Sequence, residues 1–214
     1  MKKYIITALI MVLPFGMVQA QRGLISTKKL YTQKADMSEY QAKGAVPEVD
    51  GKVVFTKDIE AFARPKDYIY SQVASFASLR FEPNTRRGEW REPNFFKNID
   101  FARVTKADKE EGIIVAQGAE EMIFSNRALS QDYTQVFYNL TITIADGKVN
   151  LRMDNIAYVY EGSGNSSRLT AEEWITDKEA LNKKGELRRI NGKFRVKTID
   201  LFDELAAEIA EKIK

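Results

Sequence analysis

Apolar and polar residues alternate along residues 133–160, and this period of two predicts a β-hairpin. Asp146-Gly147 lies at its centre, and this dipeptide favours a two-residue type I′ turn. Such a turn pairs Ala145 with Lys148 and fixes the register of both arms. One face of the hairpin is then apolar throughout, and it consists of Val136, Leu140, Ile142, Ile144, Val149, Leu151, Met153 and Ala157. We expect this face to cover the core.

The second face of the same hairpin is polar near the turn and aromatic farther from it. In an antiparallel sheet covered on one side, the second face is normally polar. The predicted register places Phe137 beside Ile156, Gln135 beside Tyr158, and Tyr133 beside Tyr160. A candidate binding face therefore consists of Tyr133, Phe137, Ile156, Tyr158 and Tyr160. The alternative is that this face is covered, by residues after Gly162 or by Trp90, Phe95 and Phe96.

Two longer helices are predicted from apolar stripes with a helical period. The first begins near Pro65 and ends before Pro83, with Ile69, Val73 and Phe76 on its buried side. The second ends the chain, and Thr198 is its expected cap. Its buried stripe consists of Phe202, Leu205, Ala206, Ile209 and Ile213.

The rest of the pattern completes an antiparallel arrangement. Strands are predicted at residues 53–56, 99–105 and 112–119, a surface loop at 83–97, a flexible loop at 162–167 and a small hairpin at 188–196. Thr170 and Glu173 form a predicted capping box that starts a short helix. An α+β fold follows, with an antiparallel sheet in the order β-α-β-β-β-β-α and the helices packed on one face.

Residues 1–20 have the composition of a secretory signal peptide. Lys2 and Lys3 precede an apolar run that ends with small residues at Ala20. The run is too short for a membrane anchor. We expect cleavage near Ala20 and a periplasmic or secreted protein. A mobile arm at 21–43 is expected to precede a single domain at 44–214, with the loop at 83–97 and a helical extension at 162–214.

The composition excludes several kinds of catalytic site. The chain has no cysteine and no histidine, which excludes disulfides, Ser-His-Asp triads and zinc sites with His or Cys ligands. The formal net charge of +3 provides no global field that attracts nucleic acid. We therefore expect no cofactor, no metal, no nucleic-acid partner and no membrane span.

Adjacent glutamates at 110–111, 120–121 and 172–173 are the remaining candidates for catalysis. A hydrolase that uses two carboxylates needs both of them across one cleft. Neighbouring side chains diverge on a strand or a helix, so these pairs are interpreted as solvated charge. The sequence thus predicts that the protein is not an enzyme.

A basic stretch lies near the end of the chain, with Glu186 among its cations. In an exported protein it indicates a weak contact with an anionic surface of lipid headgroups or polysaccharide. The alternative interpretation is a solvated strand pair. The cations are Lys183, Lys184, Arg188, Arg189, Lys193 and Arg195.

Three motifs resemble a bacterial domain family of unknown function with a TBP-like fold, common in exported proteins of Gram-negative gut bacteria. They are GAVPEVDGKVVF at 44–55, KDYIY at 66–70 and LTITIADGK at 140–148. The resemblance covers roughly residues 44–160 and implies the order strand, helix, four strands and helix. The chain departs from the family pattern after the hairpin turn, where Val149-Asn150-Leu151 precede Arg152. The family implies no catalytic residue and no ligand.

The sequence favours a non-catalytic binding or assembly module of the bacterial cell envelope, acting through the uncovered sheet face. Its partner would be an unknown envelope protein or a glycan. One alternative is a carrier for a small apolar ligand, held in a cavity between helix and sheet. Another alternative is a carboxylate-based hydrolase.

Overall fold

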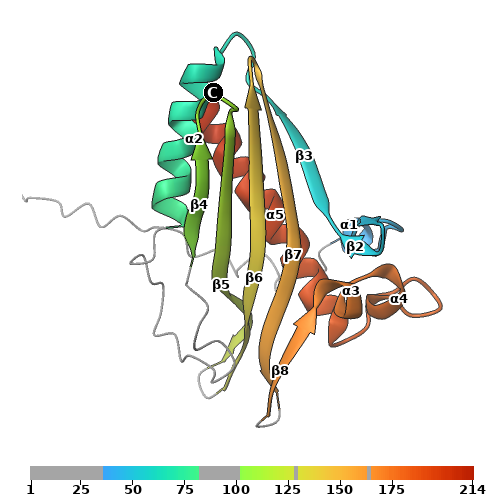
Figure 1. Ribbon diagram of the computed structural model, residues 1–214. Coiled ribbons are helices and arrows are strands. Elements are labelled where there is room, and N and C mark those ends of the chain that lie inside the picture. Colours follow the sequence, from blue (N-terminus) through green and yellow to red (C-terminus); the bar gives the residue numbers. More distant parts are fainter. Residues whose placement is uncertain (1–35, 82–101, 128–129, 163–164) are drawn as a thin grey trace, which may run out of the picture. The chain divides into compact units, whose positions relative to one another are not determined.

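The computed structural model describes residues 36–81, 102–127, 130–162 and 165–214 (Figure 1). The expected signal peptide at 1–20, residues 21–35 of the expected arm and the expected loop at 83–97 lie outside the described residues. Trp90, Phe95 and Phe96, the residues that could cover the candidate binding face, lie outside them too.

One antiparallel sheet forms the centre of the fold (Figure 1). Its strands follow the order β3 (Phe55–Glu60), β7 (Lys148–Gly162), β6 (Ser130–Ala145), β5 (Ile113–Arg127) and β4 (Arg103–Asp108). β8 (Asn165–Thr170) pairs with the last residues of β7. Its first residues fall in the segment 162–167 that the sequence predicted to be a flexible loop. β1 (Glu48–Val49) and β2 (Lys52–Val53) form a separate hairpin. β5 also runs beyond its predicted end at residue 119.

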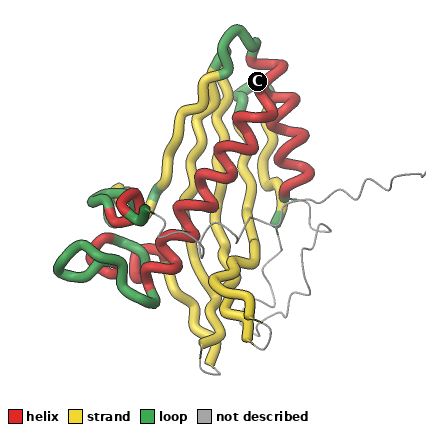
Figure 2. Tube along the Cα trace, turned by 180° about the vertical axis from the view of Figure 1, so that it is seen from behind, coloured by secondary structure: helices red, strands yellow, loops and turns green. Residues whose placement is uncertain are grey.

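Two long helices, α2 (Lys66–Arg80) and α5 (Asn191–Ile213), lie on the same face of the sheet (Figure 2). The short helices are α1 (Ser38–Gln41), α3 (Ala171–Trp174) and α4 (Asp177–Ala180). α3 begins with the predicted capping box, because the Thr170 and Glu173 side chains each bond the backbone of the other residue. The predicted α+β class and its element order are confirmed, with β8 and the β1–β2 hairpin as additional strands.

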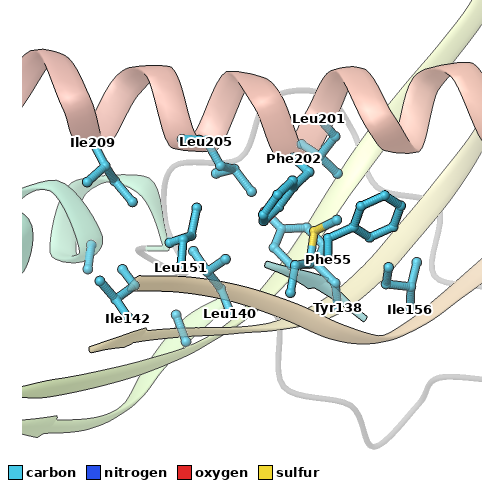
Figure 3. Close-up of a cluster of buried hydrophobic side chains, with 14 of the residues drawn as sticks. Phe55, Tyr138, Leu140, Ile142, Leu151, Ile156, Leu201, Phe202, Leu205 and Ile209 are labelled. Carbon is cyan, nitrogen blue, oxygen red and sulfur yellow. The ribbon is translucent and has the colours of Figure 1, made fainter. Parts of the chain in front are cut away.

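The core lies between the sheet and the two long helices. Figure 3 shows Phe202, Leu205 and Ile209 of α5 pointing toward Leu140 and Leu151 of the sheet. Side chains of α2 complete the same cluster. The predicted core residues are all buried, namely Ile69, Val73, Phe76, Leu140, Ile142, Leu151, Met153, Phe202, Leu205 and Ile209.

The turn between β6 and β7 also sets the start of α2. Pro65 precedes the helix and offers no capping side chain. The Asp146 carboxylate accepts a hydrogen bond from the backbone N–H of Lys66, at 2.7 Å. It therefore supplies the acceptor that the first turn of a helix needs. Its negative charge also lies at the end of the helix where the dipole favours it.

The register of β6 and β7 matches the prediction only for the half of the hairpin nearest the turn. Asn139 pairs with Asp154 as expected, but Phe137 pairs with Ala157, so β7 contains one extra residue. Asn155 adopts a positive φ of 51°, which is typical of a β-bulge. The predicted pairings beyond this point are wrong, because the bulge reverses the side-chain alternation of β7.

A second correction concerns the start of α5. The predicted hairpin at 188–196 is wrong, because α5 already begins at Asn191. Phe194 is fully buried and extends the buried side of α5 by about two turns before Phe202. Thr198 therefore lies inside the helix and does not cap it. Its hydroxyl donates to the Phe194 carbonyl at 2.8 Å and contacts the Tyr158 hydroxyl at 2.7 Å.

Candidate functional site at the wide end of the sheet

The bulge divides the candidate binding face between the two faces of the sheet. Ile156 and Tyr158 are 2% and 0% exposed and belong to the core beneath the helices. Tyr160 packs against the same core. Tyr133 and Phe137 lie on the opposite face and are half-buried. The expectation of one continuous surface formed by all five residues is therefore wrong.

Phe194 is the centre of an aromatic cluster on the helix side. Its ring centroid lies 4.6 Å from that of Phe124, 5.1 Å from Tyr158, 5.3 Å from Tyr160 and 5.8 Å from Trp174. Most of these pairs are edge-to-face, the geometry that aromatic rings prefer. The Phe194 cluster thus joins α5 to β5, β7 and α3.

Lys193 closes the Phe194 cluster toward solvent. Its ammonium lies 4.3 Å from the ring centroid of Phe124 and 4.7 Å from that of Tyr160, both within cation–π range. The same ammonium donates to both carboxylate oxygens of Asp132, at 2.7 and 2.9 Å, and to the Tyr160 hydroxyl at 3.1 Å. Lys193 is therefore held by an internal ion pair and is unsuited to an anionic partner, which corrects the prediction.

The other side of the sheet carries a different apolar group at the end remote from the Asp146-Gly147 turn, which we call the wide end. Ala157 and Val159 take the positions on β7 that the prediction gave to Ile156 and Tyr158. Both are buried, and Ile123 of β5 pairs with Tyr133 of β6 beside them. We call this set the open-face group, and it consists of Ile123, Tyr133, Phe137, Ala157 and Val159. Sequence reasoning missed Ala157 and Val159 because it did not foresee the bulge, and it missed Ile123 because the predicted strand ended at residue 119.

Arg195 is the second cation of the basic stretch that is bonded inside the domain and is therefore not available to an anionic surface. Its side chain is 0% exposed, and its guanidinium has four hydrogen-bond acceptors. Nε donates to the carbonyl of Tyr40 at 2.6 Å, and Nη1 to that of Ile175 at 2.9 Å. Nη2 donates to the carbonyl of Ala42 at 3.1 Å and to the Asp177 carboxylate at 2.8 Å. Arg195 therefore fixes α4 and residues near 40 to α5.

Residues 38–43 of the expected arm are thus bound to the domain. A second contact supports this end of the arm, since the Tyr40 hydroxyl donates to Asp200 of α5 at 2.7 Å. Desolvation by burial is the main cause that raises the pKa of Asp200 above its usual value. Glu39 and Asp203 raise this pKa further, whereas the Tyr40 hydrogen bond and the Lys197 charge oppose the shift.

We expect Asp200→Asn to stabilise the protein at neutral pH, because it removes a desolvated charge and keeps an oxygen acceptor for Tyr40. A raised folded-state pKa means that the native state binds the proton more tightly, so stability falls as pH rises through the shifted range. The gain should shrink as pH falls below the ordinary range of an aspartate. Urea denaturation at several pH values measures it, and a gain that persists in acid would contradict this origin.

The adjacent glutamates at 120 and 121 diverge as expected, but Glu120 is not solvated. Its carboxylate accepts hydrogen bonds from the Tyr138 hydroxyl and from Arg80, the latter at 2.6 Å. Glu208 of α5 also approaches Arg80, at 3.5 Å. Burial raises the pKa of the Tyr138 hydroxyl, so it acts as a donor to Glu120. These groups form a partly buried ion network between helices and sheet.

The other two glutamate pairs have separate roles. Glu173 caps α3, and Glu172 accepts from the backbone N–H of Val53 at 3.1 Å. Glu110 and Glu111 are exposed, and the Glu111 carboxylate pairs with Lys106. Within residues 36–81, 102–127, 130–162 and 165–214, no group of three acidic side chains is placed to hold a metal ion. Among the helices described, none is long and apolar enough to cross a membrane.

The fold defines the class: an α+β domain with a TBP-like fold. Residues 55–159 match the model of a domain of unknown function with TBP-like fold, DUF4468. A crystal structure of a DUF4468 family protein from Bacteroides ovatus is 34% identical, with a TM-score of 0.71, over 84% of this chain and 96% of the other. The chain belongs to the DUF4468 family.

A more distant structure shows the same fold. A TBP-like protein from Parabacteroides distasonis is 18% identical, with a TM-score of 0.59, over 78% of this chain and 96% of the other. No curated protein matches the chain. The family resemblance drawn from the three sequence motifs is confirmed, and the family is described as one of unknown function. A fold alone assigns no activity.

Proposed function

We propose that this chain is an exported, non-catalytic binding or assembly module of the bacterial cell envelope, located in the periplasm or outside the cell. The signal-like composition of residues 1–20 supports export. The absence of histidine and cysteine removes the commonest nucleophile and base pairs, which supports a role without catalysis.

The open-face group is the observation that carries the binding role. Ile123 and Tyr133 are half-buried and pair with each other on the face of the sheet opposite the core. Nearer the turn, the same face is polar, with Thr143 exposed. A tyrosine ring such as that of Tyr133 provides a large contact area when a partner removes water from it. We infer that a protein or glycan of the envelope contacts the wide end of this face.

The two alternative functions receive less support. A carrier needs a cavity between helix and sheet, but Phe55, Leu151 and Phe202 pack into the space beside α5 (Figure 3). The rings of Phe55 and Phe202 are 5.4 Å apart, so an apolar ligand would have to displace them. A hydrolase needs two free carboxylates, whereas Glu120 is neutralised by Arg80.

Site-specific photocrosslinking in the native bacterium tests the binding role. A photoreactive phenylalanine analogue at Tyr133 is expected to give a discrete crosslinked species in the envelope fraction. The matched control is the same analogue at Thr143, on the polar part of the same face, which is expected to give none. Equal crosslinking from both positions would overturn the proposed surface, and protein confined to the cytoplasm would overturn the proposed export.

A further inference from the structure

The segment between α4 and α5 is a fixed loop, and we call residues 181–190 the basic loop. Leu181 and Leu187 form a β-bridge at its base. The side-chain oxygen Oδ1 of Asn182 accepts hydrogen bonds from the backbone N–H groups of Lys184 and Glu186, at 2.8 and 3.0 Å. The backbone N–H of Asn182 donates to the Glu186 carbonyl at 2.9 Å. The loop therefore presents its side chains from an ordered backbone.

Four cations of the basic loop are exposed, in contrast to Lys193 and Arg195 of the same stretch. They are Lys183, Lys184, Arg188 and Arg189. Within the described part of the chain, none of the four forms an ion pair, although Arg188 Nε donates to the Leu181 carbonyl at 2.9 Å. The loop thus carries a concentrated positive charge whose four cations are not held in ion pairs within the described residues.

The nearby acids are already engaged. Glu179 lies 3.2 Å from Lys178, and the Glu186 carboxylate accepts from the Asn182 amide at 2.9 Å. Asp177 binds the buried Arg195. Glu186 keeps its negative charge because its partner is a neutral amide, so the basic loop, with four cations and one carboxylate, has a net charge of +3. Within the described residues none of these acids forms an ion pair with the four exposed cations, which are therefore available to an external anion.

An exposed aliphatic residue lies beside these cations. Ile190 is 53% exposed and ends the loop at the start of α5. The loop projects with α3 and α4 beyond the edge of the sheet in both views (Figures 1 and 2). Cations next to an exposed aliphatic side chain suit a bilayer interface, where headgroups are anionic and the acyl boundary is apolar. A hydrated polysaccharide would offer no apolar layer to Ile190.

We propose that the basic loop binds the surface of an anionic phospholipid bilayer. Its four cations contact headgroup phosphates, and Ile190 enters the boundary between headgroups and acyl chains. The contact is peripheral and weakens as ionic strength rises, because exposed charges are screened by salt. This surface is distinct from the open-face group, so a membrane and an envelope partner can be bound together.

Vesicle sedimentation of the chain from Gln21 onward tests the inference, because this chain keeps the whole described domain. Binding is expected to phosphatidylcholine vesicles that contain phosphatidylglycerol and not to phosphatidylcholine alone. Each cation near an anionic surface contributes roughly fivefold to partitioning. Replacing all four with glutamine should therefore lower the partition coefficient by nearly three orders of magnitude, roughly 600-fold. Ile190→Ser should lower it by roughly fivefold through lost burial.

The matched control removes the same charge elsewhere, by glutamine at the exposed residues Lys57, Lys109, Lys148 and Lys212. This control should keep most of the binding, and circular dichroism should show both variants folded. An equal loss in the control would overturn the proposal, because net charge alone would then explain the binding. Binding to soluble polygalacturonate but not to the anionic vesicles would also overturn it. Neither result would affect the crosslinking test of the open-face group.

Discussion

Arg195→Met is expected to destabilise the protein by about 3–5 kcal/mol, the range for removing one partner of a buried ion pair. The fully buried guanidinium satisfies the Asp177 carboxylate and the carbonyl groups of Tyr40, Ala42 and Ile175. Methionine fills a similar volume but donates no hydrogen bond, so these acceptors lose their partner. Urea denaturation measures the change in the free energy of unfolding.

A nearby exposed arginine provides the control for this prediction. Arg188→Met should change stability by no more than about 0.5–1 kcal/mol, because Arg188 is exposed and makes one hydrogen bond to Leu181. Hydrogen exchange should also show faster exchange at Gln41 in Arg195→Met. Equal effects of the two substitutions would show that Arg195 does not hold the N-terminal segment to α5.

Gly118→Ala is expected to cost about 3 kcal/mol, from overpacking and from a weakened buried hydrogen bond. Gly118 of β5 pairs with Tyr138 of β6, and the Tyr138 ring lies across the glycine. A Cβ atom at Gly118 would overlap ring atoms of Tyr138. The ring would have to move, and its hydroxyl would then leave the Glu120 carboxylate.

A double-mutant cycle tests this explanation. In a Tyr138→Ala background the space over residue 118 is open, so Gly118→Ala should cost little there. The coupling energy between the two positions is expected to exceed about 1.5 kcal/mol, as for residues in direct contact. If the two effects were additive, the cost of Gly118→Ala would not arise from the Tyr138 ring.

Local patterns predicted the parts of the fold that depend on neighbouring residues in the chain. The Asp146-Gly147 turn fixed the register of β6 and β7 as far as Asn139 and Asp154. The apolar stripe of α2 and the capping box of α3 also lie where their patterns indicate. Turns, caps and stripes act over a few residues, so a sequence contains the information that they need.

Which residues share the candidate binding face depends on a β-bulge at Asn155, and the alternation of apolar and polar residues does not reveal this bulge. Asn155 adopts the left-handed conformation that asparagine tolerates better than most residues, and this is the one local sign of the bulge. The bulge moves Ile156 and Tyr158 into the core and brings Ala157 and Val159 to the opposite face. An error of one residue in register therefore exchanged the two faces of the strand.

The sequence by itself determined the α+β class, the hairpin and the two long helices, because each follows from a local period. Only the tertiary structure decided which cations are available to a partner. Lys193 and Arg195 are bound by Asp132 and Asp177, whereas Arg188 and Arg189 remain exposed. Asp132 lies 61 residues from Lys193 in the chain. Contacts over such separations arise from packing between elements, and no period along the sequence encodes them.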